Sequence, residues 1–342
     1  NLAVAARTAR EQRLPLVCFV SSLGAAIDEG VAAVHGWGTA AREFVACSGL
    51  VPMVFCVTGP TVSGPALLLG LADVVVMVAE AYAFVSGPRM VEHFTGEELT
   101  NEKLGGTAIH FRTSGVAHFT VADRAEADEL IGELLSYLPD HADDEPPRWP
   151  CTDPVDRATP EAGDLIPAST TGSYDVRSVM TCIVDDGHLL EPRSEWASNL
   201  VTALATIGGR PVGMVANQPQ SVAGTLDIGA SQKGARFVAF CDAFNLPLVT
   251  LVDTSGFYPG KDLEWRGMIR YGAQMAFAYA RATVPRVCVT LRKSYGGAYI
   301  VMDSRYMGND LMLAWPSAEI AVMGARGAVE ILHRDAEDDE RA

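Results

Sequence analysis

The sequence predicts an α/β fold made by tandem duplication of one structural unit. Strand-like, loop-like and helix-like segments alternate along the 342 residues, which is typical of layered α/β proteins with buried sheets. Three segments of the first half recur in the same order in the second half, namely 14–17 at 246–249, 51–66 at 284–299 and 82–87 at 319–324, with offsets of 232, 233 and 237 residues. Three matched segments in one order indicate two copies of one unit.

Each copy contains a small-residue turn between a strand and a helix. In the second copy, the apolar run Val284 to Leu291 predicts a buried strand, and the turn Lys293 to Ala298 precedes a segment with helical spacing. In the first copy, Ser63-Gly64 stands opposite Gly296-Gly297. Glycines let a ligand approach the backbone, and the N–H groups of a first helical turn point outward as donors. The pattern indicates an oxyanion-binding backbone site in each copy, although a plain strand-to-helix turn would use the same residue types.

The remaining elements follow from apolar runs and from helical spacing of apolar residues. In the first half we expect a helix to Gln12, a strand at 14–20, a helix at 31–47, a strand from 51, a helix to 71, strands at 74–78 and 82–85, a glycine-rich loop at 104–107 with 114–118, and a surface helix at 122–138. In the second half we expect a helix at 176–184, strands at 200–205 and 211–216, a helix at 231–244, a strand at 248–252 and a helix at 267–281. Within helix 231–244, Ala235, Val238, Ala239 and Cys241 are expected to face the core, and Lys233 and Arg236 the solvent.

Two domains are predicted, at 1–150 and 151–342. Segment 139–167 is rich in Pro, Asp and Glu and lacks periodicity, so we interpret it as an interdomain linker. The most apolar run, 66–85, is interrupted by Asp73 and Glu80, which favours a buried helix and strand over a membrane span. The chain shows no signal peptide and begins in a helix-like segment without Met, which suggests that the numbering starts inside a longer polypeptide.

Composition narrows the function classes. The net charge of −16 argues against a nucleic-acid surface but is compatible with a local basic patch for an anionic cofactor. The seven cysteines contain no C-x-x-C pair, which favours small buried side chains in a reducing compartment over a disulfide framework. No histidine has metal-ligand spacing to Cys or another His, so no metal is expected, and no P-loop sequence occurs.

Several motifs closely resemble the carboxyltransferase β subunit of biotin-dependent acyl-CoA carboxylases, the propionyl-CoA and acetyl-CoA carboxylase β chains. The resemblance runs nearly end to end and is most specific in the second half. Its motifs are Asn217-Gln218-Pro219, Leu226-Asp227-Ile228, 234–238 (GARFV), 240–245 (FCDAFN), 295–299 (YGGAY), 314–316 (AWP) and 318–325 (AEIAVMGA).

This resemblance implies a fold, an activity and an assembly. The fold would be two crotonase-like (ClpP/crotonase) ββα spiral domains in tandem, with 1–150 as the acyl-CoA side and 151–342 as the biotin side. The activity would be transfer of a carboxyl group from carboxybiotin to the α-carbon of an acyl-CoA, as in fatty acid metabolism. No Met-Lys-Met sequence is present, so biotin would be carried by a biotin carboxylase/biotin carrier α subunit. Family members form trimers of dimers, which implies a homo- or hetero-hexamer in the cytoplasm or the mitochondrial matrix, with no nucleic-acid or membrane partner.

The resemblance also assigns site residues. Gly297 and Ala298, with Gly296, would hold the biotin carbonyl through backbone N–H groups. Ser63 and Gly64 would hold the thioester carbonyl. Further contacts with the substrate are expected from Gly105, Gly106 and Ile300. Both oxyanions of the reaction need such preorganised donors.

The chain departs from the family pattern at several positions. Ser63 replaces a glycine, Ala26 stands where the family has arginine, and Ile300 replaces the aspartate of propionyl-preferring members. The family's early F-G-G-S-L-G-E stretch and closing helices are absent. Two alternatives therefore stay open: a biotin-linked decarboxylase of malonyl-type CoA, and a structural, non-catalytic paralogue subunit.

A Ser-His peptidase is disfavoured. Residues 59–66 are similar to the nucleophile segment of Clp-type peptidases, but Ser86 occupies the place of the required histidine.

Overall fold

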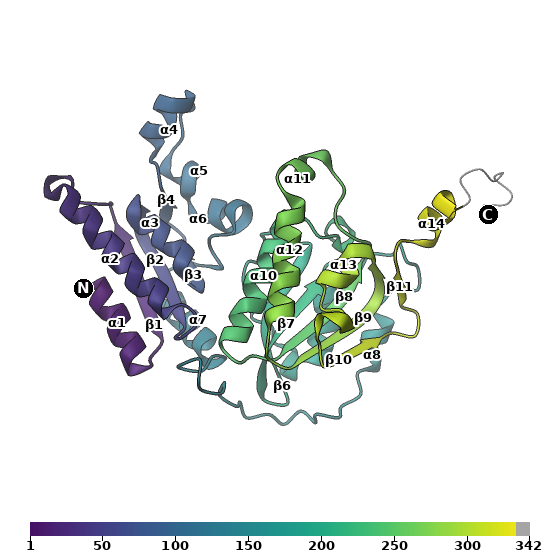
Figure 1. Cartoon of the computed structure of the whole chain (residues 1–342). Helices are drawn as coiled ribbons and strands as arrows, with labels where there is room; N and C mark the ends of the chain where they lie inside the picture. Colours follow the sequence, from purple (N-terminus) through teal and green to yellow (C-terminus); the bar gives the residue numbers. More distant parts are fainter. Residues whose placement is uncertain (333–342) are drawn as a thin grey trace. The chain divides into compact units, whose positions relative to one another are not determined.

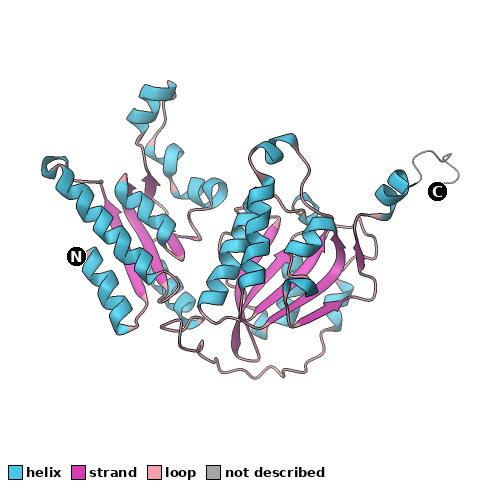
Figure 2. Cartoon of the chain, viewed as in Figure 1, coloured by secondary structure: helices cyan, strands magenta, loops and turns pink. Residues whose placement is uncertain are grey.

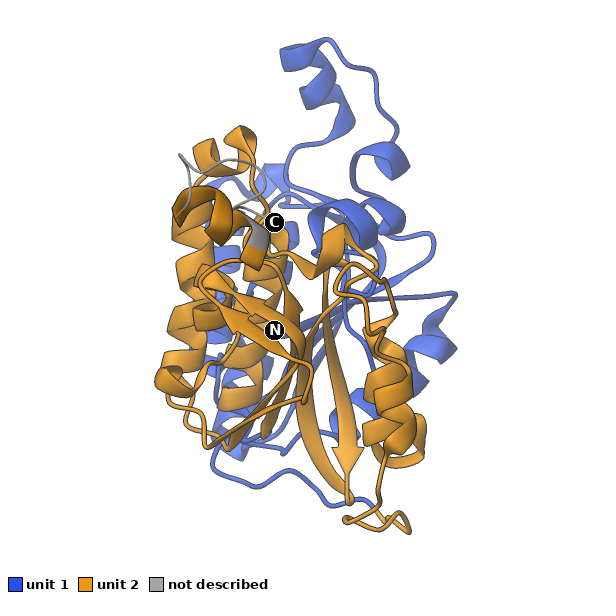
Figure 3. Ribbon diagram, turned by 90° about the vertical axis from the view of Figure 1, so that its right-hand side faces the viewer, with its two compact units in different colours: residues 1–149, 190–197, 243–246 blue, residues 150–189, 198–242, 247–342 orange. Residues whose placement is uncertain are grey.

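A computed structural model describes residues 1–332 of the chain (Figure 1). The chain divides into two compact units, coloured separately in Figure 3. Unit 1 comprises residues 1–149, 190–197 and 243–246, and unit 2 comprises 150–189, 198–242 and 247 onward. Each unit is an α/β structure built on a mainly parallel sheet, so the predicted fold class is confirmed.

Unit 1 has a five-stranded parallel sheet of order β1-β2-β3-β5, with β4 paired to β2. Its elements are α1 (Leu2–Gln12), β1 (Leu16–Ser22), η1 (Ile27–Glu29), α2 (Val31–Cys47), β2 (Met53–Val62), α3 (Gly64–Leu68), η2 (Leu69–Leu71), β3 (Val74–Val78), β4 (Tyr82–Phe84), α4 (Pro88–Thr95), α5 (Asn101–Gly105), α6 (Thr107–Ile109), η3 (His110–Ser114), β5 (Phe119–Val121) and α7 (Arg124–Ser136). Small buried residues of α1 and α2, such as Ala6 and Ala40, pack with Phe55 of β2 in one core.

Unit 2 has a six-stranded sheet of order β10-β9-β8-β7-β6, with β11 paired to β9. Its elements are α8 (Pro160–Asp164), α9 (Val176–Ile183), η4 (Asp185–Gly187), β6 (Leu200–Ile207), β7 (Arg210–Asn217), η5 (Val222–Gly224), α10 (Ile228–Ala243), β8 (Leu248–Thr254), α11 (Lys261–Trp265), α12 (Met268–Arg281), β9 (Arg286–Tyr295), α13 (Gly296–Val301), η6 (Arg305–Met307), β10 (Leu311–Ala314), β11 (Glu319–Ala321) and α14 (Ala325–Leu332). The hairpin β6–β7 is antiparallel, and the other pairs are parallel.

Helices cover both faces of the unit 2 sheet (Figure 2). On one face, Ala162 of α8 and Val179 of α9 share a core with Met214 of β7. α10 and α12 lie on the other face (Figure 1). There the Tyr279 hydroxyl of α12 lies 2.9 Å from the Thr250 hydroxyl of β8. This three-layer arrangement buries the strands almost completely.

The internal duplication is confirmed strand by strand. β2 and β9 each have 10 residues and are offset by 233; β1 and β8 have seven and are offset by 232; β4 and β11 have three and are offset by 237. In each copy the short strand pairs with the carboxyl end of the long strand. The small-residue turn follows that paired end in both copies.

Several local predictions are wrong. β9 continues through Lys293 to Tyr295, because these residues pair with β11, so the predicted six-residue turn is much shorter. The predicted loop is helical at 104, 105 and 107, in α5 and α6, and at 114, the last residue of η3, whereas 115–118 is a loop as expected. In α10, Lys233 is buried and Ala239 exposed, the reverse of the expectation.

Parts of the predicted linker are packed, and unit 1 includes two short segments, 190–197 and 243–246, that one boundary along the chain does not describe. Ala162, within segment 139–167, is fully buried in the unit 2 core, and Trp149 packs on Tyr137 with ring centroids 4.7 Å apart. Residues 190–197 belong to unit 1 because Arg193 donates to the Gly115 carbonyl at 2.7 Å, and Asn245 likewise donates to the Ala142 carbonyl at 2.7 Å. Among residues 1–332, no helix combines the length and apolar character needed to cross a bilayer.

Candidate active site

The turn at the end of β9 has glycine at two successive positions, and a side chain would be strained at the first and crowded at the second. Gly296 has φ 57°, in the left-handed region, and a Cβ there would lie 3.0 Å from the Val322 carbonyl oxygen. A Cβ on Gly297 would lie 3.2 Å from Cε2 of Phe257. The backbone therefore turns directly from strand into α13 in a way that a larger residue would obstruct.

This turn leaves two backbone donors available. Gly297 and Ala298 lie in the first turn of α13, where N–H groups have no partner within the helix. No other backbone hydrogen bond of residues 1–332 uses either N–H group. Two adjacent donors without acceptors match the chemistry of a site for a developing oxyanion.

Phe257, the aromatic ring against Gly297, is held by its own loop. Gly256 has φ 135°, and its carbonyl accepts a hydrogen bond from Leu226 N at 3.1 Å. Tyr258 N in turn donates to the Leu226 carbonyl at 2.8 Å. The loop after β8 is thus fixed on both sides of Phe257.

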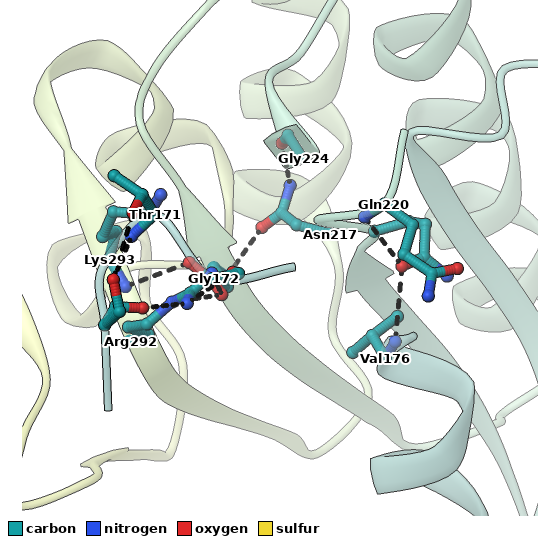
Figure 4. Close-up of polar contacts among 11 residues, drawn as sticks. Thr171, Gly172, Val176, Asn217, Gln220, Gly224, Arg292 and Lys293 are labelled. Carbon is teal, nitrogen blue, oxygen red and sulfur yellow. Dashed lines mark hydrogen bonds and ion pairs between the residues drawn. The ribbon is translucent and has the colours of Figure 1, made fainter. Parts of the chain in front are cut away.

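A buried ion pair joins the ends of β9 and β8 just before the turn in the sequence, and Figure 4 labels its arginine, Arg292. Arg292 of β9 binds Asp253 of β8 at 3.0 Å, and their side chains are 4% and 1% exposed. The Arg292 guanidinium also donates to the carbonyls of Ser169 and Gly172, both at 2.7 Å. Because every partner is hydrogen-bonded, the pair fixes the ends of two strands to segment 169–172.

The Asn-Gln-Pro motif ties neighbouring loops to the same strand ends. Asn217 accepts from Asp253 N at 3.2 Å and donates to the Gly224 carbonyl at 3.1 Å. Gln218 accepts from Val176 N at 3.4 Å and donates to Asp175 at 2.5 Å. The motif is therefore a support for the loops around the turn.

Titratable groups flank the turn on β9. Burial lowers the pKa of Lys293, which is half-buried. Burial raises the pKa of Tyr295 to about 12, and its hydroxyl donates to Glu319 of β11. The Tyr295 hydroxyl therefore stays protonated near neutral pH and anchors the short strand.

The turn of unit 1 has the same position but a different donor set. Ser63 adopts φ 62° and ψ −130°, and its N–H donates to the Phe84 carbonyl at 2.9 Å. A Cβ on Gly64 would lie 3.6 Å from Cγ of Trp37, which takes the place of Phe257 as the aromatic neighbour. Pro65, at the position of Ala298, has no N–H. Only the Gly64 N–H is left as an available backbone donor.

The ion pair before the turn is also replaced in unit 1. The repeat offsets place Ser21 opposite Asp253 and Gly59 opposite Arg292. A Cβ on Gly59 would lie only 2.7 Å from the Ser21 hydroxyl oxygen. Two small, close residues thus stand at the positions of the charged pair, and Ser21 is exposed whereas Asp253 is buried.

The other predicted site residues divide between the units. Gly105 and Gly106 are buried in unit 1, where added Cβ atoms would lie 2.0 Å from the Ala83 carbonyl oxygen and 2.6 Å from that of Glu102, so both glycines permit close packing. Ile300 lies on α13 with Gly297 and is 49% exposed. Among the described residues, no hydrogen bond joins Ser63 to a histidine, and His110 binds Ser114 and the Ala83 carbonyl.

The sequence reasoning missed the ion pair and the two aromatic neighbours. Asp253 and Arg292 could have been found by comparing the copies, because a charged residue at a strand end opposes Ser21 and Gly59. Trp37 lies in α2 and Phe257 in the loop after β8, so the two aromatic residues do not occupy matching positions of the repeat.

Comparison with known proteins agrees with this architecture. The fold is that of crotonase-like carboxyltransferases: a transcarboxylase 12S crystal structure, with methylmalonyl-coenzyme A and methylmalonic acid bound, superposes with a TM-score of 0.97 at 42% identity, covering 99% of this chain and 66% of that one. A family model described as "Carboxyl transferase domain" matches residues 1–342. The chain belongs to the carboxyl transferase domain family.

Relatives in this family are similar over most of the chain. The carboxyltransferase subunit of propionyl-CoA carboxylase from Haloferax mediterranei is 43% identical over 328 residues, which cover 96% of this chain and 64% of the relative. The methylmalonyl-CoA carboxyltransferase 12S subunit of Propionibacterium freudenreichii subsp. shermanii is 44% identical over 320 residues, which cover 94% of this chain and 61% of the relative. The chain thus spans less than two thirds of the length of these curated relatives.

Proposed function

We propose that this chain is the carboxyltransferase part of a biotin-dependent acyl-CoA carboxylase. It would transfer a carboxyl group from carboxybiotin, carried on a separate subunit, to the α-carbon of an acyl-CoA. The observation that carries the proposal is the turn at Gly296-Gly297-Ala298, with two backbone donors that no hydrogen bond of residues 1–332 uses. The names of relatives, which include propionyl-CoA carboxylase and methylmalonyl-CoA carboxyltransferase subunits, support the substrate class.

The donor set of unit 2 fits the carbonyl oxygen of a ureido group. The two N–H groups are neutral, preorganised and free of competing side chains, since Gly296 and Gly297 have none. Carboxybiotin supplies the carboxyl group and, after its loss, a ureido nitrogen that accepts the α-proton. Gly297 and Ala298 would stabilise the negative charge on the ureido oxygen, and two such donors contribute several kcal/mol each.

For unit 1 we propose a modified oxyanion site for the thioester carbonyl. The Gly64 N–H would be one donor. The Ser63 hydroxyl, which makes no hydrogen bond among residues 1–332, would be the second, because the Ser63 N–H is bound to Phe84 and Pro65 has none. Gly105, Gly106 and Ile300 would shape the acyl and coenzyme site, with Ile300 setting chain-length preference.

The domain roles and partners belong to the same proposal. Residues 1–150 would form the acyl-CoA side and residues 151–342 the biotin side. A biotin carboxylase/biotin carrier α subunit would deliver the carboxyl group. The hexamer assembly named for transcarboxylase 12S supports a homo- or hetero-hexamer, and mitochondrial relatives from pig and human support a location in the matrix or the cytoplasm.

A second candidate function is that of a structural subunit beside a catalytic paralogue. The single backbone donor in unit 1 favours it, because loss of one oxyanion donor costs about 10²- to 10³-fold in kcat. The reverse reaction, decarboxylation of a malonyl-type CoA, would use the same turns.

The test is transfer of labelled carboxyl from a carboxybiotinylated carrier subunit to acyl-CoAs of increasing chain length, using the full-length protein. We expect turnover in the wild type and a loss of at least 100-fold in Gly297→Val and in Gly64→Val. Gly132→Ala is the matched control, because a Cβ there meets nothing within 4 Å. Turnover that appears only when a paralogue is added would contradict catalysis by this chain and support the structural role.

A further inference from the structure

Asp303 is a fully buried acid just after the helix that begins at the unit 2 turn. α13 ends at Val301, and Asp303 has φ 56°, in the left-handed region. Its side chain is 0% exposed, and its Oδ1 lies 2.5 Å from Nη1 of Arg286, whose side chain is 4% exposed. The Asp303 carbonyl accepts a hydrogen bond from Nδ2 of Asn309 at 2.6 Å. Both the side chain and the backbone of Asp303 are therefore fixed.

Arg286 connects Asp303 to the strand that ends in the turn. Arg286 is the first residue of β9, and Gly296 directly follows the last. The Arg286 guanidinium also donates to the Met307 carbonyl at 3.2 Å, and the Arg286 N–H donates to Asp310 at 2.8 Å. The segment 303–310 is thus bound to the beginning of β9. α13 is therefore held at its start by the end of β9 and, just after its end, by the beginning of the same strand.

α13 is short, so a shift at its C-terminal end also moves its first turn. Its six residues extend about 9 Å at about 1.5 Å per residue. Met302, directly before Asp303, donates its N–H to the carbonyl of Ala298 at 3.0 Å. Ala298 also carries one of the two available N–H groups of the turn. Because a misplacement of about 1 Å in a catalytic group can lower the rate about 100-fold, the attachment at Asp303 affects what the turn can do.

The charge of Asp303 is compensated on one oxygen alone. Its Oδ2 has no hydrogen-bond partner within residues 1–332. Tyr279 of α12, Cys288 of β9 and Asp310 also lie near it, and burial raises the pKa of Tyr279 and of Cys288, so both stay neutral near neutral pH. Burial raises the pKa of Asp303 to about 6, although Arg286 opposes the shift. A change of one or two pH units around neutrality therefore decides whether Arg286 faces an anion.

We propose that Asp303 is a positioning residue for carboxyl transfer: its carboxylate, bound to Arg286, holds α13 where the Gly297 and Ala298 N–H groups meet the ureido oxygen. This inference rests on the proposed function. Protonation of Asp303 leaves Arg286 buried without an anion, so α13 loses its attachment. The raised folded-state pKa means that the protonated form favours folding, so stability and carboxyl transfer should change with pH in opposite directions.

The first measurement is kcat and KM for carboxyl transfer from the carboxybiotinylated carrier subunit, in the full-length wild type and Asp303→Asn, between about pH 5 and about pH 8. The ratio of the wild-type kcat to the variant kcat should rise about tenfold from about pH 5 to about pH 7.5, because about one tenth of Asp303 is ionised at about pH 5. KM should change less than about twofold, since oxyanion donors act in the transition state. Asp262→Asn, which removes an exposed carboxylate paired with Arg266, is the control and should match the wild type.

The second measurement is amide hydrogen exchange of residues 296–301, which requires no substrate. After correction for the intrinsic pH dependence of exchange, these amides in the wild type should be several-fold less protected at about pH 5 than at about pH 7.5. In Asp303→Asn they should be weakly protected at both values. Amides of α10 serve as the internal control and should not change between the two values.

Two results would overturn the proposal. One is a kcat ratio that stays constant with pH while circular dichroism shows both proteins to be folded. The other is equal protection of α13 at both pH values in the wild type, which decides the matter even if Asp303→Asn does not fold. Absence of turnover in the wild type at every pH would instead refute the proposed function, and the exchange comparison would then decide alone whether Asp303 holds α13.

Discussion

The two turns of this molecule share one backbone position but differ in what supports them. In unit 2, Gly296 takes the left-handed conformation and two N–H groups are available. In unit 1, Ser63 takes a similar conformation, and Pro65 removes one donor. The difference teaches that the strand-turn-helix geometry survives changes that alter its chemistry, because strand pairing fixes the geometry and the turn residues fix the donors.

The residues at the strand ends that precede each turn also differ between the two units. Unit 2 has the buried pair Arg292–Asp253, whereas unit 1 has Ser21 against Gly59. A buried pair holds strand ends in one arrangement, while two small residues rely on close packing. We expect the unit 2 turn to be the more sensitive to substitution of the residues before it.

The largest effect is expected from breaking the unit 2 pair. Arg292→Leu leaves the Asp253 carboxylate buried and unpaired, so the free energy of unfolding should fall by about 3–5 kcal/mol, measured by urea denaturation. The double variant Asp253→Asn/Arg292→Met removes both charges and should lose less than the single variant. Arg266→Ala, which breaks an exposed pair with Asp262, is the control and should cost less than about 1 kcal/mol. If Arg292→Leu lowered the free energy of unfolding by less than about 1 kcal/mol, the expected difference between the two units would be contradicted.

A second expected difference is the pH dependence contributed by buried acids in the two units. Burial raises the pKa of Asp303 to about 6 despite its pair with Arg286, and its second carboxylate oxygen has no hydrogen-bond partner in the described chain. An acid whose pKa is higher in the folded state binds protons more tightly there, so stability falls as the pH rises from about 4 to about 6 and is level above that range. From the ordinary value of 3.8, the fall is up to about 3 kcal/mol.

Glu43 of unit 1 should show the opposite slope. Its pKa is lowered, so its stabilising contribution is present above its ordinary range and is lost as the pH falls through the folded-state pKa. Unfolding curves of the wild type, Asp303→Asn and Glu43→Gln between about pH 3 and pH 7 measure both slopes, because the Glu43 contribution changes below the ordinary glutamate pKa of 4.5. For each variant, the measured quantity is its free energy of unfolding minus that of the wild type. If this difference changed with pH in the same direction for both variants, the expected opposite slopes would be refuted.

The smallest effect concerns Ser63. A non-glycine residue at φ 62° and ψ −130° is strained, so Ser63→Gly should raise the free energy of unfolding by about 1 kcal/mol. The converse change, Gly296→Ser, should lower it by a similar or larger amount, because the new Cβ lies 3.0 Å from the Val322 carbonyl oxygen. Ser178→Gly in α9 is the control and should cost several tenths of a kcal/mol. If the Ser63 hydroxyl acts as a donor, Ser63→Gly also loses carboxyl transfer; a more active variant would contradict that role.

Elements set by burial were predictable from sequence. The helix at 31–47 and the strand at 74–78 match α2 and β3 residue for residue, because a continuous core imposes their periodicity. The end of β9 was not predictable, since its extension depends on pairing with the distant β11. Gly105 suggested a loop, yet it is the last residue of α5. Glycine is needed there for close packing against the Ala83 carbonyl, which the sequence pattern does not reveal.

The candidate site was predictable in position but not in donor count. The internal repeat located both turns from residues alone. That the Ser63 N–H is occupied depends on where β4 places the Phe84 carbonyl, which no local pattern reveals. Lys233 was misplaced for a related reason: a helical pattern assigns charged residues to solvent, and tertiary packing buried this one.

The exchange of Asp253 and Arg292 for Ser21 and Gly59 also restricts how the two copies could have diverged. An arginine placed alone at Gly59 would collide with the Ser21 side chain, whereas Ser21 is exposed, so a carboxylate placed there would stay in contact with water. A change from the small pair to the charged pair is therefore obstructed at Gly59 and not at Ser21, which restricts the order in which the two substitutions can occur.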